Sequence, residues 1–265
     1  MSPALDDERR FASIERLLGN AASRQLAAAH VLIVGIGGVG SWVAEALARS
    51  GIGSLTLMDL DHVAVSNVNR QVHALESTFG QAKVISMQER IAQINPRCRV
   101  TVVGEFLSAE NMERILSTRF DVVVDAIDQV SVKVLLAAEA RRLGQALIIC
   151  GAAGGKSDPT QIQVADLADV SNDPLLAKLR QRLRKEHGFV SAMPSGAAKE
   201  PKKAAARMQV TCVYSKEQMR HDLPVQDGSA GLACAGYGSI VTVTASLGFV
   251  AAAQAMKIIC SVSRS

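Results

Sequence analysis

A glycine-rich turn stands near the start of the chain, directly after the apolar run 31–34. Gly35, Gly37 and Gly40 fit the pattern G-x-G-x-x-G, and Gly38 lies inside it. Glycine suits such a turn because the backbone must approach a phosphate without a Cβ atom in the way. The helix predicted to follow would offer free N–H groups and a positive dipole end to that phosphate. The pattern therefore predicts a nucleotide-binding turn.

Acids, amides and cations follow this turn. Asp59 ends a second apolar run nineteen residues after Gly40, where a ribose-binding carboxylate is expected in a βαβ unit. Lys83 opens a later helix, and the stretch between them holds four more polar candidates, Asp61, Asn67, Asn69 and Arg70. An arginine and a lysine near the turn suit a triphosphate, whose charge they neutralise while pyrophosphate leaves. These residues favour ATP over a nicotinamide cofactor, which has no such need.

A second pair of acids, Asp125 and Asp128, follows the buried run 120–124. Ligands of open α/β sheets bind outside the carboxyl ends of the strands, so both acids are candidates for the same site. Taken alone, they could equally be caps at a strand end, and Arg70 and Lys83 taken alone could be surface charges. His73 has no second metal ligand near it in the sequence, which favours a structural role.

Hydrophobic periodicity predicts the elements that position these residues. Strands are predicted at 31–34, 54–59, 99–103, 120–128, 146–150, 162–166 and 209–215, and helices at 8–29, 42–47, 80–94, 108–118, 131–143, 173–185 and 239–260. This alternation predicts an α/β fold with a Rossmann-like, doubly wound and mostly parallel sheet, followed by a C-terminal extension of strands and helices. We expect one domain over 8–265, with a nucleotide-binding core at 30–150 and a C-terminal segment at 151–265 that faces tRNA or a second subunit. Two stretches are predicted to be loose, a flexible loop at 151–160 and a mobile segment at 190–208.

The bulk composition excludes several classes of protein. The 265 residues are 48% apolar and 20% charged, as in an ordinary α/β domain. The first ten residues contain no apolar signal core, so we expect a cytoplasmic protein. The five cysteines form no C-x-x-C pair, which argues against a structural zinc and a disulfide framework. Aromatic residues are only 3%, which disfavours base stacking as the means of gripping nucleic acid.

The net charge of +4 is unevenly distributed. Residues 171–220 hold eleven lysines and arginines against four acids, and four cations gather on the helix predicted there: Arg180, Arg182, Arg184 and Lys185. A basic surface beside a mildly acidic body favours a polyanionic partner at that end of the chain. A solvated helix face is the alternative interpretation of the same charges.

The apolar stretch 239–260 has the length of a membrane span. However, it contains Thr242, Thr244, Ser246, Gln254 and Lys257, and its bulk is alanine and valine. We therefore expect a helix buried in the domain or in a subunit interface, with no membrane span.

These motifs together resemble the adenylating enzymes related to ubiquitin activation, which transfer AMP from ATP to a carboxylate. The resemblance rests on the glycine turn at 35–41, Asp59 with Asp61, the motif 66–71, Lys83, and Asp125 with Asp128. Further motifs resemble the tRNA threonylcarbamoyladenosine dehydratases within that superfamily, namely 51–53, 69–74, 90–96, 158–162 and 234–238. The resemblance covers about residues 10 to 257.

The resemblance implies ATP-dependent ring closure of threonylcarbamoyladenosine in tRNA. The glycines would line the phosphates, Asp59 would hold the ribose, and Asn67, Arg70 and Lys83 would bind phosphate. Asp128, supported by Asp125, would act near Mg²⁺ and the α-phosphate. Arg16 resembles an arginine that relatives supply across a homodimer. Catalysis would thus fall to Arg70, Lys83, Asp128 and Arg16.

Two alternative functions remain open at the level of sequence. A sulfur-carrier-protein adenylyltransferase, with a sulfur-transfer partner, would need thiol chemistry at Cys212 or Cys234, whereas relatives of that kind often have paired C-x-x-C motifs that are missing here. An NAD-dependent oxidoreductase could use the same glycine turn, but it would not depend on Arg70 and Lys83. The basic segment 171–220 favours tRNA over a small carrier protein.

Overall fold

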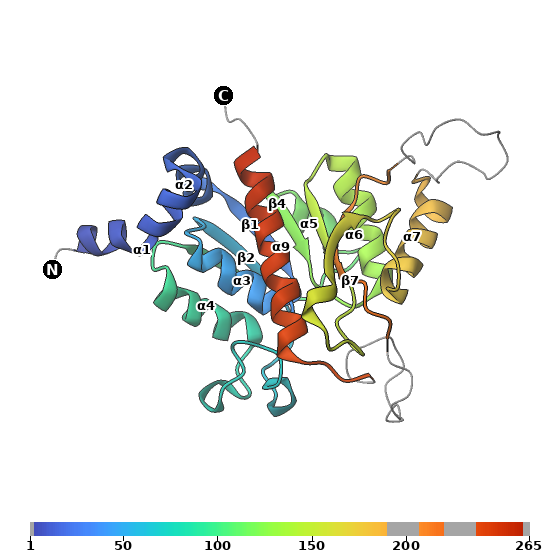
Figure 1. The fold of residues 1–265 in the computed structure, drawn as a ribbon, viewed down its shortest axis with the longest axis horizontal. Coiled ribbons are helices and arrows are strands. Elements are labelled where there is room, and N and C mark those ends of the chain that lie inside the picture. The colour runs from blue at the N-terminus through green and yellow to red at the C-terminus, as the bar shows by residue number, and fades with distance from the viewer. Residues whose placement is uncertain (1–2, 190–206, 220–236, 262–265) are drawn as a thin grey trace.

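One mixed sheet of seven strands runs through the computed structural model, which describes residues 3–189, 207–219 and 237–261, with side chains from residue 9 (Figure 1). The strands are β1 (His30–Val34), β2 (Ser54–Met58), β3 (Arg99–Val103), β4 (Val122–Asp125), β5 (Leu147–Cys150), β6 (Ile162–Asp166) and β7 (Thr211–Ser215). Their order is β3-β2-β1-β4-β5-β7-β6, and every pairing is parallel except that of β6 with β7. The predicted Rossmann-like, mostly parallel α/β fold is confirmed.

Helices cover both faces of the sheet. They are α1 (Pro3–Leu18), α2 (Asn20–Ala28), α3 (Gly40–Arg49), α4 (Lys83–Ile94), α5 (Met112–Leu116), α6 (Val130–Leu143), α7 (Pro174–His187) and α9 (Val241–Ser261). Successive side chains of a strand point to opposite faces. Accordingly, Val31 and Ile33 of β1 join one core cluster with α3, α4 and α9, whereas Leu32 and Val34 join another with α5. A third cluster fills the space between β7, α6 and α7.

Three predicted elements differ from those observed. The helix predicted at 8–29 is two helices, because Gly19 has φ 84° and breaks the chain direction between α1 and α2. The helix predicted at 108–118 is only the five residues of α5, and the strand predicted at 120–128 ends at Asp125. The predicted mobile segment 190–208 lies almost wholly outside the described residues, as does Cys234.

The long apolar helix α9 lies against the sheet and α3, as expected for a helix buried in the domain (Figure 1). Its inner face belongs to the main core, with Val243, Leu247, Ala251, Ala255 and Ile259 all buried. Gly248 lets the two helices meet closely, because a Cβ atom there would lie 2.6 Å from the Cβ of Trp42. By length and composition alone α9 could also cross a membrane, but half of its most apolar window is buried inside the protein.

Candidate active site

The candidate site lies where the strand order reverses, between β1 and β4. At this switch point the loops that leave neighbouring strands diverge and open a crevice. A cavity of about 410 Å³ lies there, and we call it the nucleotide pocket. Its walls come from the glycine turn after β1, the segments after β2 and β3, residues 126–129 after β4 and residues 151–153 after β5. Thr244 of α9 and Leu175 of α7 complete it.

The glycine turn has different requirements at different positions. A Cβ atom on Gly40 would lie 1.8 Å from the carbonyl oxygen of Gly35, so that position tolerates only glycine. Gly35 has φ 90°, a conformation that L side chains rarely adopt. Gly37 has no atom within 4 Å of its hypothetical Cβ and lines the pocket, as does Gly38. Gly35 and Gly40 therefore shape the turn, Gly37 leaves open space beside it, and Gly38 allows Thr244 and Arg70 to approach closely.

Asp59 is buried at the end of β2 and lines the pocket. Its Oδ2 accepts a hydrogen bond of 2.7 Å from the backbone N–H of Ile36, inside the glycine turn. Its Oδ1 accepts one of 2.9 Å from the N–H of Asp61. The carboxylate thus joins the turn after β1 to the segment after β2, and these two bonds fix its position in the pocket wall.

Lys83 begins α4 and lines the pocket beside Asp61. The two side chains form an ion pair of 2.7 Å, in which Lys83 is only 8% exposed and Asp61 is 53% exposed. The alternative interpretation of Lys83 as a surface charge is therefore wrong. Its backbone N–H also donates to the carbonyl of Asp61, so the lysine is held at both ends.

Arg70 lines the pocket beside Gly38, with its Cγ 3.3 Å from the hypothetical Cβ of that glycine. Its guanidinium donates to the carbonyl of Ser66 and to Oδ1 of Asn69, both at 2.8 Å. Its own carbonyl accepts a bond from the indole N–H of Trp42 at 3.0 Å. The backbone of Arg70 is therefore fixed by α3, and its side chain is partly exposed toward the pocket.

The two acids after β4 occupy different environments. Asp128 is exposed and lines the pocket. Asp125 is fully buried beneath the pocket, where its Oδ1 lies 2.9 Å from the ammonium of Lys133, itself fully buried. Burial raises the pKa of the Asp125 carboxyl, and the Lys133 charge opposes that rise. Direct ligand binding by Asp125 is thus disfavoured, and it supports Asp128 indirectly by accepting the N–H of Ile127 at 3.2 Å.

Lys133 was not predicted as a site residue. It lies in the first turn of α6, where the helix dipole disfavours a cation, so its position could have indicated that a carboxylate partner lies nearby. Its ammonium also donates to the carbonyl of Cys150 at 3.1 Å. One buried cation therefore connects the ends of β4 and β5, from which two walls of the pocket begin.

Besides Gly40 and the buried Asp125, three further predicted site residues lie outside the pocket lining. Asn67 is buried and its Oδ1 accepts the N–H of Ala64 at 3.0 Å, which shapes the short helical turn Val65–Asn67. Asn69 donates to the carbonyl of Ser239 at 2.8 Å. Arg16 is exposed on α1, and its guanidinium bonds Ser13 at 2.9 Å. Within one chain, then, Arg16 is not part of the pocket.

The loop 151–160, predicted to be flexible, is held by two carboxylates. Asp173 accepts the N–H of Ala152 at 2.9 Å. Glu217 accepts the N–H groups of Ser157 and Asp158, both at 2.8 Å. The prediction of flexibility was wrong because it rested on the glycine content of the loop. The carboxylates that hold the loop lie far along the chain, and the loop sequence does not reveal them.

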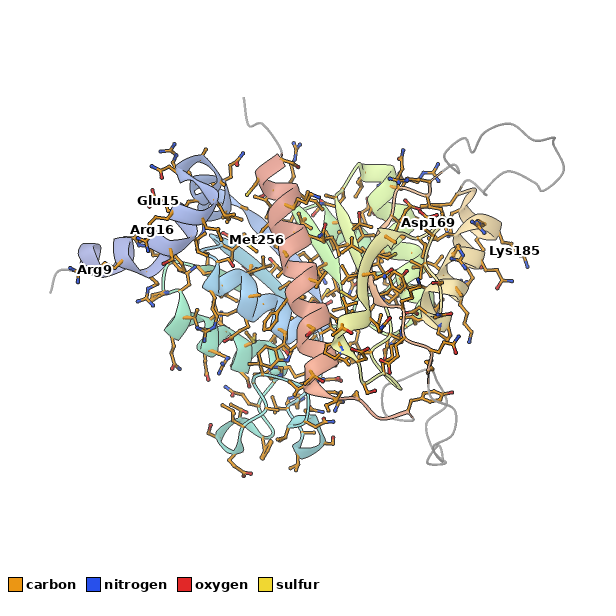
Figure 2. All side chains as sticks on the ribbon, in the orientation of Figure 1. Arg9, Glu15, Arg16, Asp169, Lys185 and Met256 are labelled. Atoms are coloured by element: carbon orange, nitrogen blue, oxygen red, sulfur yellow. The ribbon has the colours of Figure 1, made fainter. Side chains whose placement is uncertain are left out.

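The four basic residues of α7 are not equivalent. The guanidinium of Arg180 donates to the carbonyls of Val170 and Leu167, at 2.7 and 3.2 Å, so it stabilises the preceding loop. Arg182 forms a two-point ion pair with Glu186. The Nε atom of Arg184 is buried without a hydrogen-bond partner. Lys185 is exposed and points away from the body of the protein (Figure 2).

The described thiols have the properties of packed side chains. Burial raises the pKa of Cys150 to about 12 and that of Cys98 to about 11, and it raises the pKa of Cys212 well above its usual value. A thiolate is the reactive form, so none of these three is suited to thioester or sulfur chemistry. The described residues also contain no cluster of three metal-binding side chains.

A second cavity of about 440 Å³ is lined by Arg10, Arg49 and Arg90, but these guanidinium groups have partners in the protein. Arg49 and Arg90 both bind the buried carboxylate of Glu45, and Arg10 donates to the carbonyl of Ile94. The nucleotide pocket is therefore the better candidate for catalysis.

Comparison with known proteins gives a consistent result over almost the whole chain. Residues 10–265 match the model of the ThiF family. The chain is 45% identical to the tRNA threonylcarbamoyladenosine dehydratase of Escherichia coli (strain K12), covering 97% of this chain and 96% of that protein. The crystal structure of the E. coli tRNA N6-threonylcarbamoyladenosine dehydratase in complex with ATP superposes with a TM-score of 0.84, and that of its complex with AMP with 0.83. Both superpositions include 97% of this chain and 96% of the E. coli chain, and the sequence identity in each is 45%.

Proposed function

The chain belongs to the ThiF family, and on this premise we propose that it is an ATP-dependent tRNA threonylcarbamoyladenosine dehydratase. The observation that carries the proposal is a single pocket at the sheet's switch point. That pocket joins a glycine turn, a ribose-binding acid and two cations, Arg70 and Lys83, with the exposed acid Asp128. Likeness to the E. coli dehydratase along the whole chain supports the same reaction class.

The first step adenylates the threonyl carboxylate of the modified nucleoside. One carboxylate oxygen attacks the α-phosphorus of ATP, the bond from that phosphorus to the bridging oxygen breaks, and pyrophosphate leaves with the electron pair. Arg70 and Lys83 stabilise the negative charge that grows on the phosphates. The turn around Gly37 and Gly38 receives the phosphates, and Asp59 holds the ribose.

The second step closes the ring without a covalent enzyme intermediate. A nucleophile in the carbamoyl part of the same modification attacks the activated carbonyl and displaces AMP. Both reacting groups belong to one side chain, so proximity supplies much of the rate. The sum of the two steps is the loss of one water from the nucleoside, with AMP and pyrophosphate as the other products.

Mg²⁺ fits this pocket because hard oxygen ligands stand at its phosphate side. Asp128 is an exposed carboxylate in the lining, without a protein cation as its partner among the described residues. Asp128 would hold the ion together with phosphate oxygens, and the ion would neutralise phosphate charge. Asp61 is a weaker candidate, because Lys83 already pairs with it.

The tRNA partner is supported by the surface cations of α7: Lys185 is exposed, and Arg182 is partly exposed beside its ion-pair partner Glu186. Arg180 is the one that we now assign to the fold, since two backbone carbonyls use its guanidinium. Phosphate contacts of this kind position a nucleic acid without reading its sequence.

A homodimer would supply Arg16 to the pocket of the other copy. Exposed apolar side chains at two places support such an assembly. They are Leu17 and Leu18 on α1 and Phe249 on α9. Exposed apolar surface of this kind is typical of protein interfaces. Figure 2 shows Arg16 at the opposite end of the molecule from Lys185, so an interface at α1 would leave the basic helix free.

The decisive experiment incubates the protein with ATP, Mg²⁺ and tRNA that carries threonylcarbamoyladenosine. Nucleoside mass analysis should show the loss of one water, together with stoichiometric AMP and pyrophosphate. A product that appears without ATP, or ATP cleavage without any change in the nucleoside, would overturn the assignment. NAD in place of ATP should give no reaction.

A further inference from the structure

A second buried ion pair lies at the far end of the pocket from Asp59. The side chains of Lys156 and Asp173 are both fully buried, with 3.7 Å between the ammonium nitrogen and Oδ2. No step of the proposed reaction uses either residue. Fully buried charges are costly unless they are paired and hydrogen-bonded, so their contacts indicate what the pair holds in place.

Asp173 joins the pocket wall to the start of α7. Its Oδ1 accepts the N–H of Leu176 at 3.0 Å and so caps the N-terminus of that helix. Its Oδ2 accepts the N–H of Ala152 at 2.9 Å, in the wall of the pocket. The approach is so close that a Cβ atom on Gly151 would lie 2.3 Å from Oδ2. One carboxylate therefore fixes the distance between wall and helix.

Lys156 ties the same unit to the sheet. Its ammonium donates to the carbonyl of Ser215, the last residue of β7, at 2.7 Å. The pair thus connects three elements that are far apart in the sequence, namely the loop after β5, the end of β7 and the beginning of α7. Because α7 also packs on α6 through Leu176, Leu179 and Leu183, the helix is rigidly seated against this end of the pocket.

The order of the strands determines which substrate meets this end. Asp59 lies on the β2 side of the pocket, and the glycine turn with Asp128 lies at its centre, between β1 and β4. ATP bound with its ribose on Asp59 and its phosphates on the turn leaves the β5 side free. That side is lined by Gly151, Ala152, Ala153 and Leu175, without a charged group among them.

We propose that this β5-side end, lined by 151–153 and Leu175, is the subsite for the tRNA-borne threonylcarbamoyl group, and that Lys156 and Asp173 position it relative to the tRNA-docking helix α7. The inference rests on the proposed function. Leu175, which lines the subsite, is the second residue of α7, and the same helix carries the cations proposed to bind tRNA. A tRNA held on α7 would therefore present its modified nucleoside at a fixed distance from the α-phosphate.

The test uses the double variant Lys156→Met/Asp173→Asn in the full-length protein. This variant leaves no unpaired buried charge. Asparagine has one acceptor oxygen where aspartate has two, so the side chain at position 173 could cap α7 or accept the N–H of Ala152, but not both. We expect kcat for dehydration of modified tRNA to fall by about 100-fold, as small misplacements of reacting groups do. The dissociation constants for ATP and for tRNA, measured separately, should change by less than about threefold, because neither the glycine turn nor the cations of α7 are altered.

A matched control removes an exposed pair instead, with Arg142→Met/Glu139→Gln on α6, and should retain wild-type kcat. Wild-type kcat in the buried double variant would overturn the proposal, and so would an equal loss of ATP affinity, which would assign the pair to the whole pocket. If the double variant does not fold by circular dichroism, Leu175→Ala supplies a second test, because it alters the lining of the subsite and leaves the buried pair intact; it should lower kcat without changing the affinity for ATP. An inactive wild type would refute the proposed function, whereas an active wild type with an unaffected variant would refute only this inference.

Discussion

Nζ of Lys83 lies 2.7 Å from Oδ2 of Asp61, and the lysine is buried while the aspartate is half exposed. The pair places a positive charge in the pocket wall before any ligand arrives. A phosphate can approach the same ammonium group, because Lys83 has three N–H donors and the bond to Asp61 uses one of them. The arrangement keeps the lysine extended toward the site, which lowers the entropy lost when the phosphate binds.

Lys83→Ala should lower turnover by about two to three orders of magnitude, as the loss of a charge partner in the transition state does. The remaining Asp61 is exposed, so the free energy of unfolding should fall only modestly. Turnover is measured by pyrophosphate release, and stability by urea unfolding. Lys257→Ala, an exposed lysine on α9, is the control for folding and charge. Near-normal turnover in Lys83→Ala would remove this residue from the catalytic set.

Asp128→Asn keeps the shape of an exposed side chain and removes its charge. Adenylation should fail while tRNA still binds, because Asp128 lies in the nucleotide pocket and not on α7. Raising the Mg²⁺ concentration should recover part of the activity if the carboxylate helps to hold the ion. Pyrophosphate release at the wild-type rate would mean that Mg²⁺ is held elsewhere.

Two glycines of the same turn should respond differently to alanine. Gly40→Ala places a methyl group against the carbonyl of Gly35, so the variant should lose the turn and much of its stability. Gly37→Ala meets no protein atom within 4 Å and should fold normally, but it should bind ATP more weakly because its methyl group enters the pocket. Calorimetric unfolding and ATP titration distinguish the two effects, and equal stability of both variants would contradict the geometry.

Arg182→Glu/Lys185→Glu should weaken tRNA binding and flatten its dependence on salt, because each lost phosphate contact lowers the slope by about one. Affinity for ATP should not change. Arg180→Glu is expected to destabilise the domain, since two carbonyls would lose their donor. Binding is measured at two salt concentrations. Unchanged affinity would place the docking surface away from α7.

His73 should make the protein less stable in mild acid. Burial, followed by the charges of Lys83 and Arg90, lowers the pKa of this histidine from 6.5 to about 4. The folded state therefore resists a proton that the unfolded chain accepts, so its stability is complete above pH 6.5 and declines as the pH falls toward 4. At pH 5 the free energy of unfolding should be about 2 kcal/mol lower than at neutral pH because of this histidine.

Urea unfolding at pH 7.5 and pH 5 checks this expectation, and His73→Leu should lose most of the pH dependence over that interval. Removal of the exposed His62, as His62→Gln, is the control. An unchanged pH profile in His73→Leu would assign the acid sensitivity to carboxylates, such as the buried Glu45, whose pKa is lowered by its two arginines against the opposing effect of burial.

The sequence by itself determined the fold class and most of the residues that line the nucleotide pocket. Local patterns were sufficient, because buried parallel strands read as apolar runs and a phosphate-binding turn needs glycines at fixed spacing. Gly37 follows β1 and Asp59 follows β2, and the parallel order of the strands brings both of them to one edge. The location of the site at this edge could be predicted once the strands were assigned, because ligands of such sheets bind at the carboxyl ends of the strands.

Tertiary structure alone decided which polar residues serve the site and which serve the fold. Asp125 and Asp128 are three residues apart, but one is buried on Lys133 and the other lines the pocket. Arg180 and Lys185 share a helix, but one binds backbone carbonyls and the other faces solvent. Lys156, in a loop that looked flexible, is fully buried on Asp173. The physical reason is that burial and partnership depend on residues far along the chain, which no local pattern contains.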